Sequence, residues 1–281
     1  MPTPLGNLRD ITQRALDALR ECDLLVAEDT RVARRLLAAY GIAGKPLWSY
    51  REQNAPGATA PILERAQAER VVVVSDAGMP GISDPGRELL NAAREAGVVV
   101  EVLPGPVAFI TAAVLSGFPT NGLSFEGFVP RAAGQRERAF AAALARGVTS
   151  AWYEAPNRLI ATLEALHDIA PGLRVFVARE LTKFHEQQIL GTPEEALAAL
   201  ERPVRGEIVL LLAPHDVSAA QGAPNSGLDL NADIEAALDA GLAVATAAKT
   251  LARRHALARD DVYATIVERK RARRGGNGTR D

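Results

Sequence analysis

The sequence predicts an α/β protein with two α/β domains and a small helical region toward its C-terminus. In the first half of the 281-residue chain, short and nearly continuous Val and Leu runs alternate with helical patterns. Such alternation is typical of a parallel sheet covered by helices on both faces. After residues 117–125, which are rich in turn formers, the pattern changes, and the alternating segment "FHEQQIL" suits an antiparallel strand of a mixed sheet. A polar linker then leads to short Ala-rich helices.

These changes divide the chain into four parts, and its length is enough for two ordinary domains. We expect the first α/β domain over residues 1–118 and the second over 119–217. The linker would cover 218–231, and a basic helical region would cover 232–281.

The first domain is expected to contain strands joined by helices. The apolar runs that predict strands are 23–27, 46–50, 71–75 and 98–103. Helical patterns follow the first two runs, over 30–41 and 61–70, and Gly41 can end the first of them. A third helix is expected over 85–96, because Asp84 can cap it, Pro85 suits its first position and Gly97 can end it.

The second domain is expected to combine a mixed sheet with further helices. The predicted strands lie near 124–128, 149–154, 174–179, 185–191 and 206–213. The predicted helices cover 134–146, 157–168 and 193–201, and the last, basic helix of the chain lies at about 259–272.

Composition excludes several classes of protein. The single cysteine, Cys22, rules out an intramolecular disulfide and a metal site built from several cysteines, and we expect it to pack in the core. No window reaches the roughly 18 uninterrupted apolar residues of a membrane helix, and the first ten residues lack a signal-peptide pattern. No His, Asp and Glu cluster has metal-ligand spacing, so we predict no metal. We expect a cytoplasmic protein with no membrane partner.

Charge is distributed unevenly along the chain. The net charge is −2, yet residues 249–281 carry ten Lys and Arg against four Asp and Glu. A basic end on an acidic body suggests an appendage that binds a polyanion. A solvated tail is an equally good interpretation of the last 14 residues alone.

Three loops follow predicted strands, at the sheet edge where open α/β sheets bind ligands. They are "AEDTR" (27–31), "SDAGMPGISDPG" (75–86) and "LPGPVAFITA" (103–112). The chain lacks G-x-G-x-x-G after a strand and G-x-x-x-x-G-K-[ST], which argues against nicotinamide enzymes, nucleotide hydrolases and the commonest methyltransferase fold.

Six motifs in order make a specific resemblance. They are "TPLGNLRDIT" (3–12), "AEDTR", "SDAGMPGISDPG", "LPGPVA", "EAPNRL" (154–159) and "ARELTKFHE" (178–186). With these motifs the chain resembles the ribosomal RNA small subunit methyltransferase I family, the 16S rRNA cytidine 2′-O-methyltransferases of the tetrapyrrole methylase superfamily. The resemblance implies a homodimer that acts on 16S rRNA in the small ribosomal subunit.

The resemblance also implies that S-adenosylmethionine binds in a cleft between the two domains. The residues that it places around this methyl donor are Leu5, Asp76, Gly78, Met79, Ala108, Phe109, Tyr153 and Ala178. A domain interface suits a ligand that is half apolar adenosine and half charged amino acid. A plain turn aspartate is the alternative interpretation of Asp76.

A ribose hydroxyl needs a proton acceptor before it can attack the donor. Glu180, or Lys183 with a depressed pKa, is our candidate, while Arg179 is expected to bind RNA and His185 to be structural. An ordinary surface ion-pair cluster is the competing interpretation of "ARELTKFHE". The other residues expected to contact substrate are Asp29, Arg31, Arg253, Arg254 and Lys270, although Asp29 could only cap a helix.

Two other functions fit parts of the sequence. A tetrapyrrole acceptor would keep the donor site, but the basic appendage and "ARELTK" disfavour it. A non-catalytic rRNA-binding assembly factor would keep only the fold. Relatives also carry several apolar residues before the T-P-[IL]-G-N motif, whereas only Met1 and Pro2 precede Thr3 here. We therefore expect that the native chain begins upstream of Met1.

Overall fold

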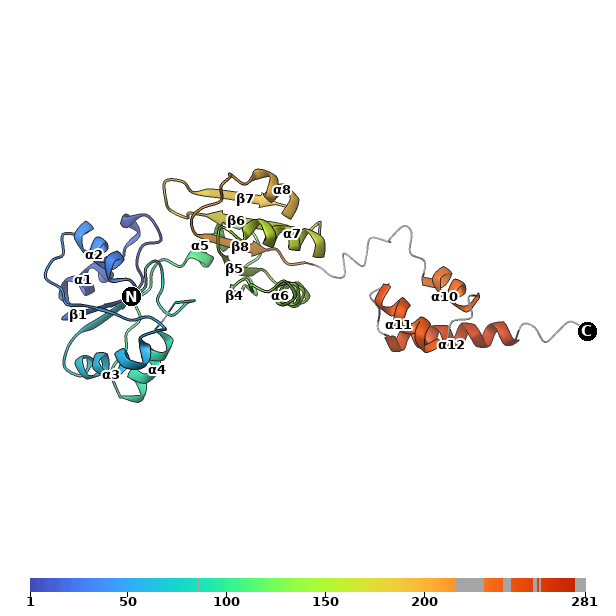
Figure 1. The fold of residues 1–281 in the computed structure, drawn as a ribbon, viewed down its shortest axis with the longest axis horizontal. Helices are drawn as coiled ribbons and strands as arrows, with labels where there is room; N and C mark the ends of the chain where they lie inside the picture. Colours follow the sequence, from blue (N-terminus) through green and yellow to red (C-terminus); the bar gives the residue numbers. More distant parts are fainter. Residues whose placement is uncertain (85, 216–229, 240–243, 255–256, 258, 276–281) are drawn as a thin grey trace, which may run out of the picture. The chain divides into compact units, whose positions relative to one another are not determined.

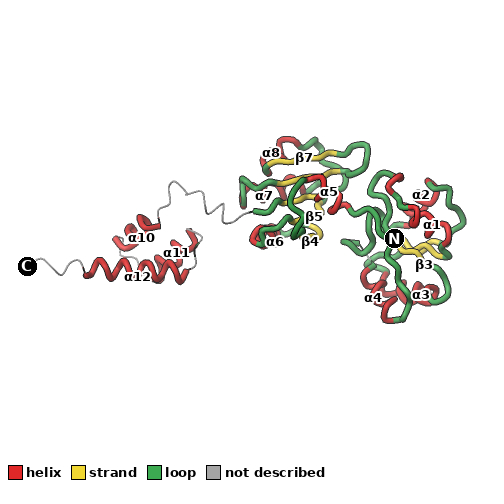
Figure 2. Tube along the Cα trace, turned by 180° about the vertical axis from the view of Figure 1, so that it is seen from behind, coloured by secondary structure: helices red, strands yellow, loops and turns green. Residues whose placement is uncertain are grey.

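The structure is a computed structural model that describes residues 1–281 except 85, 216–229, 240–243, 255–256, 258 and 276–281 (Figure 1). The chain divides into two compact units, residues 1–215 and residues 216–281. The first unit contains both sheets, and the described part of the second contains only helices (Figure 2).

The first sheet is parallel, as the sequence predicts. Its strands are β1 (Leu24–Ala27), β2 (Leu47–Ser49) and β3 (Val71–Val74), in the order β2-β1-β3. Strand β1 lies in the centre, with Leu25 opposite Leu47 and Leu24 opposite Val71. All four of its residues are buried, which explains why this run has no polar position.

Helices cover both faces of this sheet. On one face, α1 (Gln13–Glu21) and α2 (Thr30–Ala39) pack through residues such as Leu19 and Leu37, and Cys22 is buried there as expected. On the other face, α3 (Ala55–Ala66) and α4 (Arg87–Glu95) pack through Ile62 and Leu89.

The fourth predicted strand, over 98–103, is wrong. This segment has no strand, and the side chains of Val99 and Val102 are 95% and 62% exposed. The first residues of the chain lie along the free edge of β3 instead. The Met1 amino group donates to the Val73 carbonyl at 2.7 Å, and Thr3 and Gly78 form a β-bridge. Residues 98–103 therefore have no partner strand in this sheet, although their sequence has a high β-propensity.

The predicted start of the helix at 85 is also wrong. Helix α4 begins at Arg87, and its N-cap is Gly86, whose φ of 138° favours glycine. Asp84 therefore does not cap the helix, and Pro85 lies outside the described residues. The side chain of Asp84 can therefore serve a purpose other than helix capping.

The second sheet is mixed, as predicted. Its strands are β4 (Ser124–Phe128), β5 (Ser150–Glu154), β6 (Val175–Arg179), β7 (Gln187–Gly191) and β8 (Ile208–Leu212). Their order is β4-β5-β8-β6-β7; β4 and β5 are parallel, and the other pairs are antiparallel. The central strand β8 is wholly buried, which fits its run of Ile, Val and Leu.

Helices also cover both faces of the second sheet. Helices α6 (Ala133–Ala145), α7 (Leu159–Ile169) and α8 (Pro193–Ala199) share a core with one face, centred on Phe140, Trp152 and Leu210. Helix α5 (Ala108–Ser116) packs on the other face through Ala112 and Ala113. The boundary expected after residue 118 stays a prediction.

The second unit contains α10 (Leu230–Asp239), α11 (Val244–Arg254) and α12 (Arg259–Gly275). These helices share a small core that includes Ile234, Ala248, Leu251, Val262 and Ile266. Among the described residues of the whole chain, no helix has the length and apolarity that a bilayer span requires.

Candidate functional site

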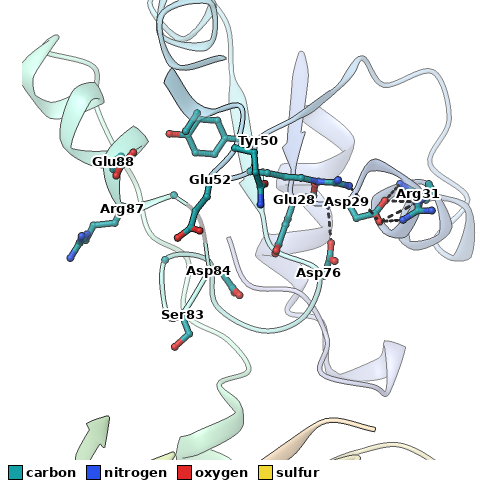
Figure 3. Close-up of a pocket in the computed structure, with 15 residues that line it drawn as sticks. Glu28, Asp29, Arg31, Tyr50, Glu52, Asp76, Ser83, Asp84, Arg87 and Glu88 are labelled. Atoms are coloured by element: carbon teal, nitrogen blue, oxygen red, sulfur yellow. Dashed lines mark hydrogen bonds and ion pairs between the residues drawn. The ribbon is translucent and has the colours of Figure 1, made fainter. Parts of the chain in front are cut away.

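Two adjoining cavities open beside the carboxyl ends of the first sheet, where α/β folds bind ligands. The larger, which we call the polar cavity, has a volume of about 680 Å³ and is built from the residues that follow β1, β2 and β3 (Figure 3). Its charged lining residues are Glu28, Asp29, Arg31, Arg51, Glu52, Asp76, Asp84, Arg87 and Glu88.

Three carboxylates meet in the polar cavity. Glu28 follows β1, while Asp76 and Asp84 belong to the long loop after β3, and their side chains surround one space in Figure 3. Desolvation raises the pKa of Glu28 and of Asp76; repulsion from Asp76 adds to the rise for Glu28, and repulsion from Asp29 adds to the rise for Asp76. The Asp29 amide donates to the Asp76 Oδ1 atom at 3.0 Å, which partly offsets the rise for Asp76.

Asp84 has the most perturbed pKa of these three carboxylates. Desolvation, followed by repulsion from Glu28, raises its pKa from 3.8 to about 6. The charges of Asp76 and Glu207 act in the same direction. Asp84 is therefore ionised at neutral pH and able to take up a proton near pH 6.

Asp29 does cap a helix. Its carboxylate accepts from the Arg31 amide at 2.8 Å at the start of α2 and pairs with the Arg31 guanidinium at 2.6 Å. These hydrogen bonds hold the pKa of Asp29 well below its usual range. Arg31 stays exposed despite this pair, so the structure allows the expected contact between Arg31 and substrate, which stays a prediction.

The second cavity, which we call the apolar cavity, has a volume of about 200 Å³ and lies between residues of the two sheets. It is lined by five of the residues expected to hold the methyl donor: Leu5, Gly78, Met79, Ala108 and Tyr153. Gly78 has a φ of 76°, and a Cβ atom there would lie 3.2 Å from the Leu5 side chain, so only glycine fits without strain.

Phe128 and Tyr153 line the apolar cavity, and Phe125 and Phe109 pack behind them. Phe109 stacks on Phe125 at 4.3 Å, Phe125 meets the edge of Tyr153 at 4.9 Å, and Phe128 meets Tyr153 at 5.6 Å. Desolvation raises the pKa of Tyr153 to about 12, so its hydroxyl stays protonated and can donate a hydrogen bond.

The other expected donor residues lie near this cavity but do not line it. Asp76 faces the polar cavity, and Phe109 supports Tyr153 through Phe125. Ala178 is fully buried in β6, in the core beneath α5. The donor assignments of all these residues stay predictions.

Asp84 lines both cavities, together with Ser83. The sequence analysis assigned Asp84 to a helix cap and so missed it as a site residue. The signal is the repeated Ser-Asp pair in "SDAGMPGISDPG", which places a second acid on the same loop. Glu207, which also lines the apolar cavity, precedes β8 and has no comparable signal.

Glu180 and Lys183, our candidates for the proton acceptor, form an ion pair. The Lys183 Nζ atom lies 2.8 Å from Glu180 Oε1 and 2.9 Å from Glu207 Oε2. Desolvation acts to lower the pKa of Lys183, but these hydrogen bonds outweigh it and the net shift is upward. The idea of Lys183 with a depressed pKa is therefore wrong. For Glu180, desolvation is outweighed by Lys183 and the Glu207 amide, and its pKa is lowered.

Arg179 is a structural residue in this fold. It is 7% exposed, and its guanidinium pairs with Glu201 at 2.7 Å and donates to Gln187 at 3.1 Å. Burial and pairing argue against the expected RNA contact of Arg179, which stays a prediction. His185 precedes β7, which begins two residues later than predicted, and its side chain is exposed. Its expected structural role stays a prediction.

The second unit holds the remaining expected RNA contacts. Lys270 is half-buried on α12. Arg253 and Arg254 belong to α11, but their side chains lie outside the described residues. Within the part of the chain that the structure describes, no group of three or more His, Cys, Asp or Glu residues could hold a metal ion.

Comparisons with known proteins identify relatives over most of the chain. Residues 2–198 match the family described as tetrapyrrole (corrin/porphyrin) methylases. A ribosomal RNA small subunit methyltransferase I from a Hydrogenobaculum species is 42% identical over 218 residues, which are 76% of this chain and 94% of that protein. The protein of the same name from a Synechocystis species is 38% identical over 270 residues, which are 95% of both chains.

Solved structures support the fold alone. A diphthine synthase superposes with a TM-score of 0.60 at 15% identity, covering 75% of this chain and 87% of that one. Uroporphyrin-III C-methyl transferase from Thermus thermophilus, solved as a complex with S-adenyl homocysteine, superposes with a TM-score of 0.53 at 22% identity. That match covers 78% of this chain and 96% of the other.

Proposed function

We propose that this chain methylates the ribose 2′-hydroxyl of a cytidine in 16S rRNA, with S-adenosylmethionine as donor. The chain belongs to the tetrapyrrole methylase family and, within it, to the ribosomal RNA small subunit methyltransferase I group. The observation that carries this proposal is the 38% identity to a relative of that name over 95% of both chains. Such an enzyme works in the cytoplasm, on the small ribosomal subunit, without a membrane partner.

The residues of the apolar cavity fit the donor. Leu5, Met79 and Ala108 offer apolar walls to the adenosine, and the close backbone at Gly78 leaves room for it. Where this cavity meets the polar one, the carboxylate of Asp84 can attract the positively charged groups of the donor. When bound, S-adenosylmethionine supplies a methyl group that is already activated by its positive sulfur.

The polar cavity fits the acceptor, and Asp84 fits the role of proton acceptor. Asp84 lines both cavities, which supports a position of its carboxylate between donor and ribose. With a pKa of about 6 it is ionised at neutral pH, yet it is a stronger base than an ordinary aspartate. Glu180 and Lys183 then hold the shape of the site through their ion pair instead of moving the proton.

Exposed cations beside the polar cavity support an RNA acceptor. Arg31, Arg34 and Arg35 lie on α2, are exposed, and surround a shallow hollow that Asp29 also lines. Arginines in such a row suit phosphate contacts, which position RNA without reading its sequence. Lys270 on α12 of the second unit stays a further expected phosphate contact.

We also propose a homodimer, supported by the exposed face of α5. This helix is apolar apart from Thr111 and Ser116. Ala112 and Ala113 pack on the second sheet, while Ile110, Val114 and Leu115 are 45%, 73% and 42% exposed. An exposed apolar helix face is typical of a subunit interface. Sedimentation should show a dimer for the natural chain and a monomer for Val114→Asp; a monomeric natural chain would contradict the proposal.

The function is tested with S-adenosylmethionine that carries an isotopic label on its methyl group. The protein is offered small ribosomal subunits from cells that lack this activity, naked small-subunit rRNA, or a tetrapyrrole precursor. Label on one cytidine ribose supports the proposal. Label on the tetrapyrrole would instead indicate a tetrapyrrole methyltransferase of the same family. Binding of rRNA without donor binding and without label would favour a non-catalytic assembly factor.

A further inference from the structure

Phe184 is the most exposed large apolar side chain of the residues that the structure describes. It is 96% exposed and lies in the loop between β6 and β7. An aromatic ring in water forgoes the favourable free energy of burial, roughly 1.5–3 kcal/mol for a side chain of this size. Single exposed apolar residues are common, so the setting of this ring decides what it does.

The loop that carries Phe184 is held firmly. We call residues 180–186 the platform loop. Glu180 and Thr182 have φ values of 53° and 64°, and residues other than glycine adopt such values only when their surroundings hold them there. The Lys183 amide donates to the Glu180 carbonyl at 3.0 Å, and the Thr182 amide donates to the Glu186 carboxylate at 2.6 Å. The ring therefore projects from a fixed backbone.

The Phe184 ring is also oriented by its neighbour. The rings of Phe184 and His185 meet edge to face, with 5.0 Å between their centroids and an angle of 86°. Such a pair leaves a face of the Phe184 ring open to solvent.

The platform loop lies at the rim of the apolar cavity. Its Leu181 lines that cavity, and its Lys183 pairs with Glu207, which lines the cavity as well. The loop also contacts the first motif of the chain, because the Asn7 amide donates to Thr182 Oγ1 at 3.0 Å. Two residues further on, Arg9 is exposed, and its side chain has no ion pair among the described residues.

We propose that Phe184, held by His185, is a platform on which an unpaired nucleobase of the RNA substrate stacks. The inference rests on the proposed function and adds how the protein holds the RNA strand that is methylated. RNA is recognised mainly where bases are unpaired and can stack on aromatic side chains. Arg9 on the adjoining loop supplies a cation for a neighbouring phosphate.

A nucleobase fits this feature better than a protein partner. Residues around Phe184 in the loop are polar, and they are engaged in hydrogen bonds with one another. A stable protein interface buries about 800 Å² on each partner around an apolar centre. Phe184 offers a planar face but little other apolar area, which is enough for stacking of one base and too little for a protein interface.

The experiment compares Phe184→Ala, Phe184→Leu and Phe184→Trp in methyl transfer to unmodified small subunits. Stacking on one base is worth a factor of about 5 to 150 in affinity, so Ala should raise KM for the subunits by such a factor. Leu should raise it nearly as much, because it is apolar but lacks a planar face, and Trp should restore it. Val99→Ala, at a site that is 95% exposed and lines neither cavity, should leave KM unchanged. Full activity of the Leu variant would overturn the platform.

A second readout does not depend on methyl transfer. In the full-length Phe184→Trp protein, a short single-stranded oligocytidine should quench the fluorescence of the new indole, whereas in Val99→Trp it should not. Absence of quenching and of any KM effect overturns the platform even if the enzyme methylates rRNA. Quenching in a protein that methylates no rRNA would instead refute the proposed function and leave base stacking intact.

Discussion

Replacing Asp84 by asparagine should make the protein more stable and less active at the same time. Asparagine has nearly the same shape as aspartate but stays neutral, so it removes the charge that the two cavities disfavour. The same change removes the proposed proton acceptor. Opposite effects on stability and activity are expected where a fold holds a functional group in an unfavourable state.

The size and the pH dependence of the stability effect follow from the raised pKa of Asp84. A pKa raised from 3.8 to about 6 corresponds to about 3 kcal/mol at neutral pH, and solvent screening of this half-buried group reduces that to about 1–2 kcal/mol. Because the folded-state pKa is the higher one, the folded protein binds the proton more tightly. The contribution of Asp84 to the free energy of unfolding is therefore most favourable below about pH 4 and becomes less favourable as pH rises through about 6.

The assay is urea unfolding of both proteins at pH 8 and at pH 4, followed by tryptophan fluorescence. Asp84→Asn should unfold at a higher urea concentration at pH 8, and the difference should shrink toward pH 4. Its rate of methyl transfer should fall by about 10²–10⁴-fold, the usual contribution of a general base. The natural enzyme should lose activity as pH falls below about 6. Equal stability at pH 8, or an unchanged rate, would refute the reasoning.

Two further substitutions test the supports of the site. Thr162→Val should lower the free energy of unfolding by about 1–3 kcal/mol, because it removes the hydroxyl that donates to the buried Glu154 at 2.6 Å. The control Thr250→Val, in an exposed position, should change the free energy of unfolding by less than about 0.5 kcal/mol in the same urea titration. Gly206→Ala should destabilise by about 1–3 kcal/mol, because the residue has a φ of 89° and its new methyl group would meet the Glu180 side chain; a thermal midpoint equal to that of the natural protein would contradict this reading.

The apolar pattern of the sequence was enough to predict the sheets. Helices pack on both faces of the first sheet, and its central strand β1 is wholly buried, so a continuous apolar run identifies a parallel strand there. Strand β2 is half-buried, and β3 alternates between half-buried and buried residues. The alternation in β7 likewise reflects an edge strand with one buried side. The segment over 98–103 shows the limit, because β-propensity does not say whether a partner strand is available.

The sequence by itself determined the α/β class, the order of the motifs and the loop after β3 as a place for a ligand, because these depend on local pattern and on resemblance. Only the tertiary structure decided what each charged group does. Lys183 is held in its charged form by Glu180 and Glu207, and Arg179 is buried against Glu201. Asp84, which looked like a helix cap, lies on two cavities with a raised pKa. Protonation and accessibility depend on neighbours that are distant in the sequence, and the fold alone brings them together.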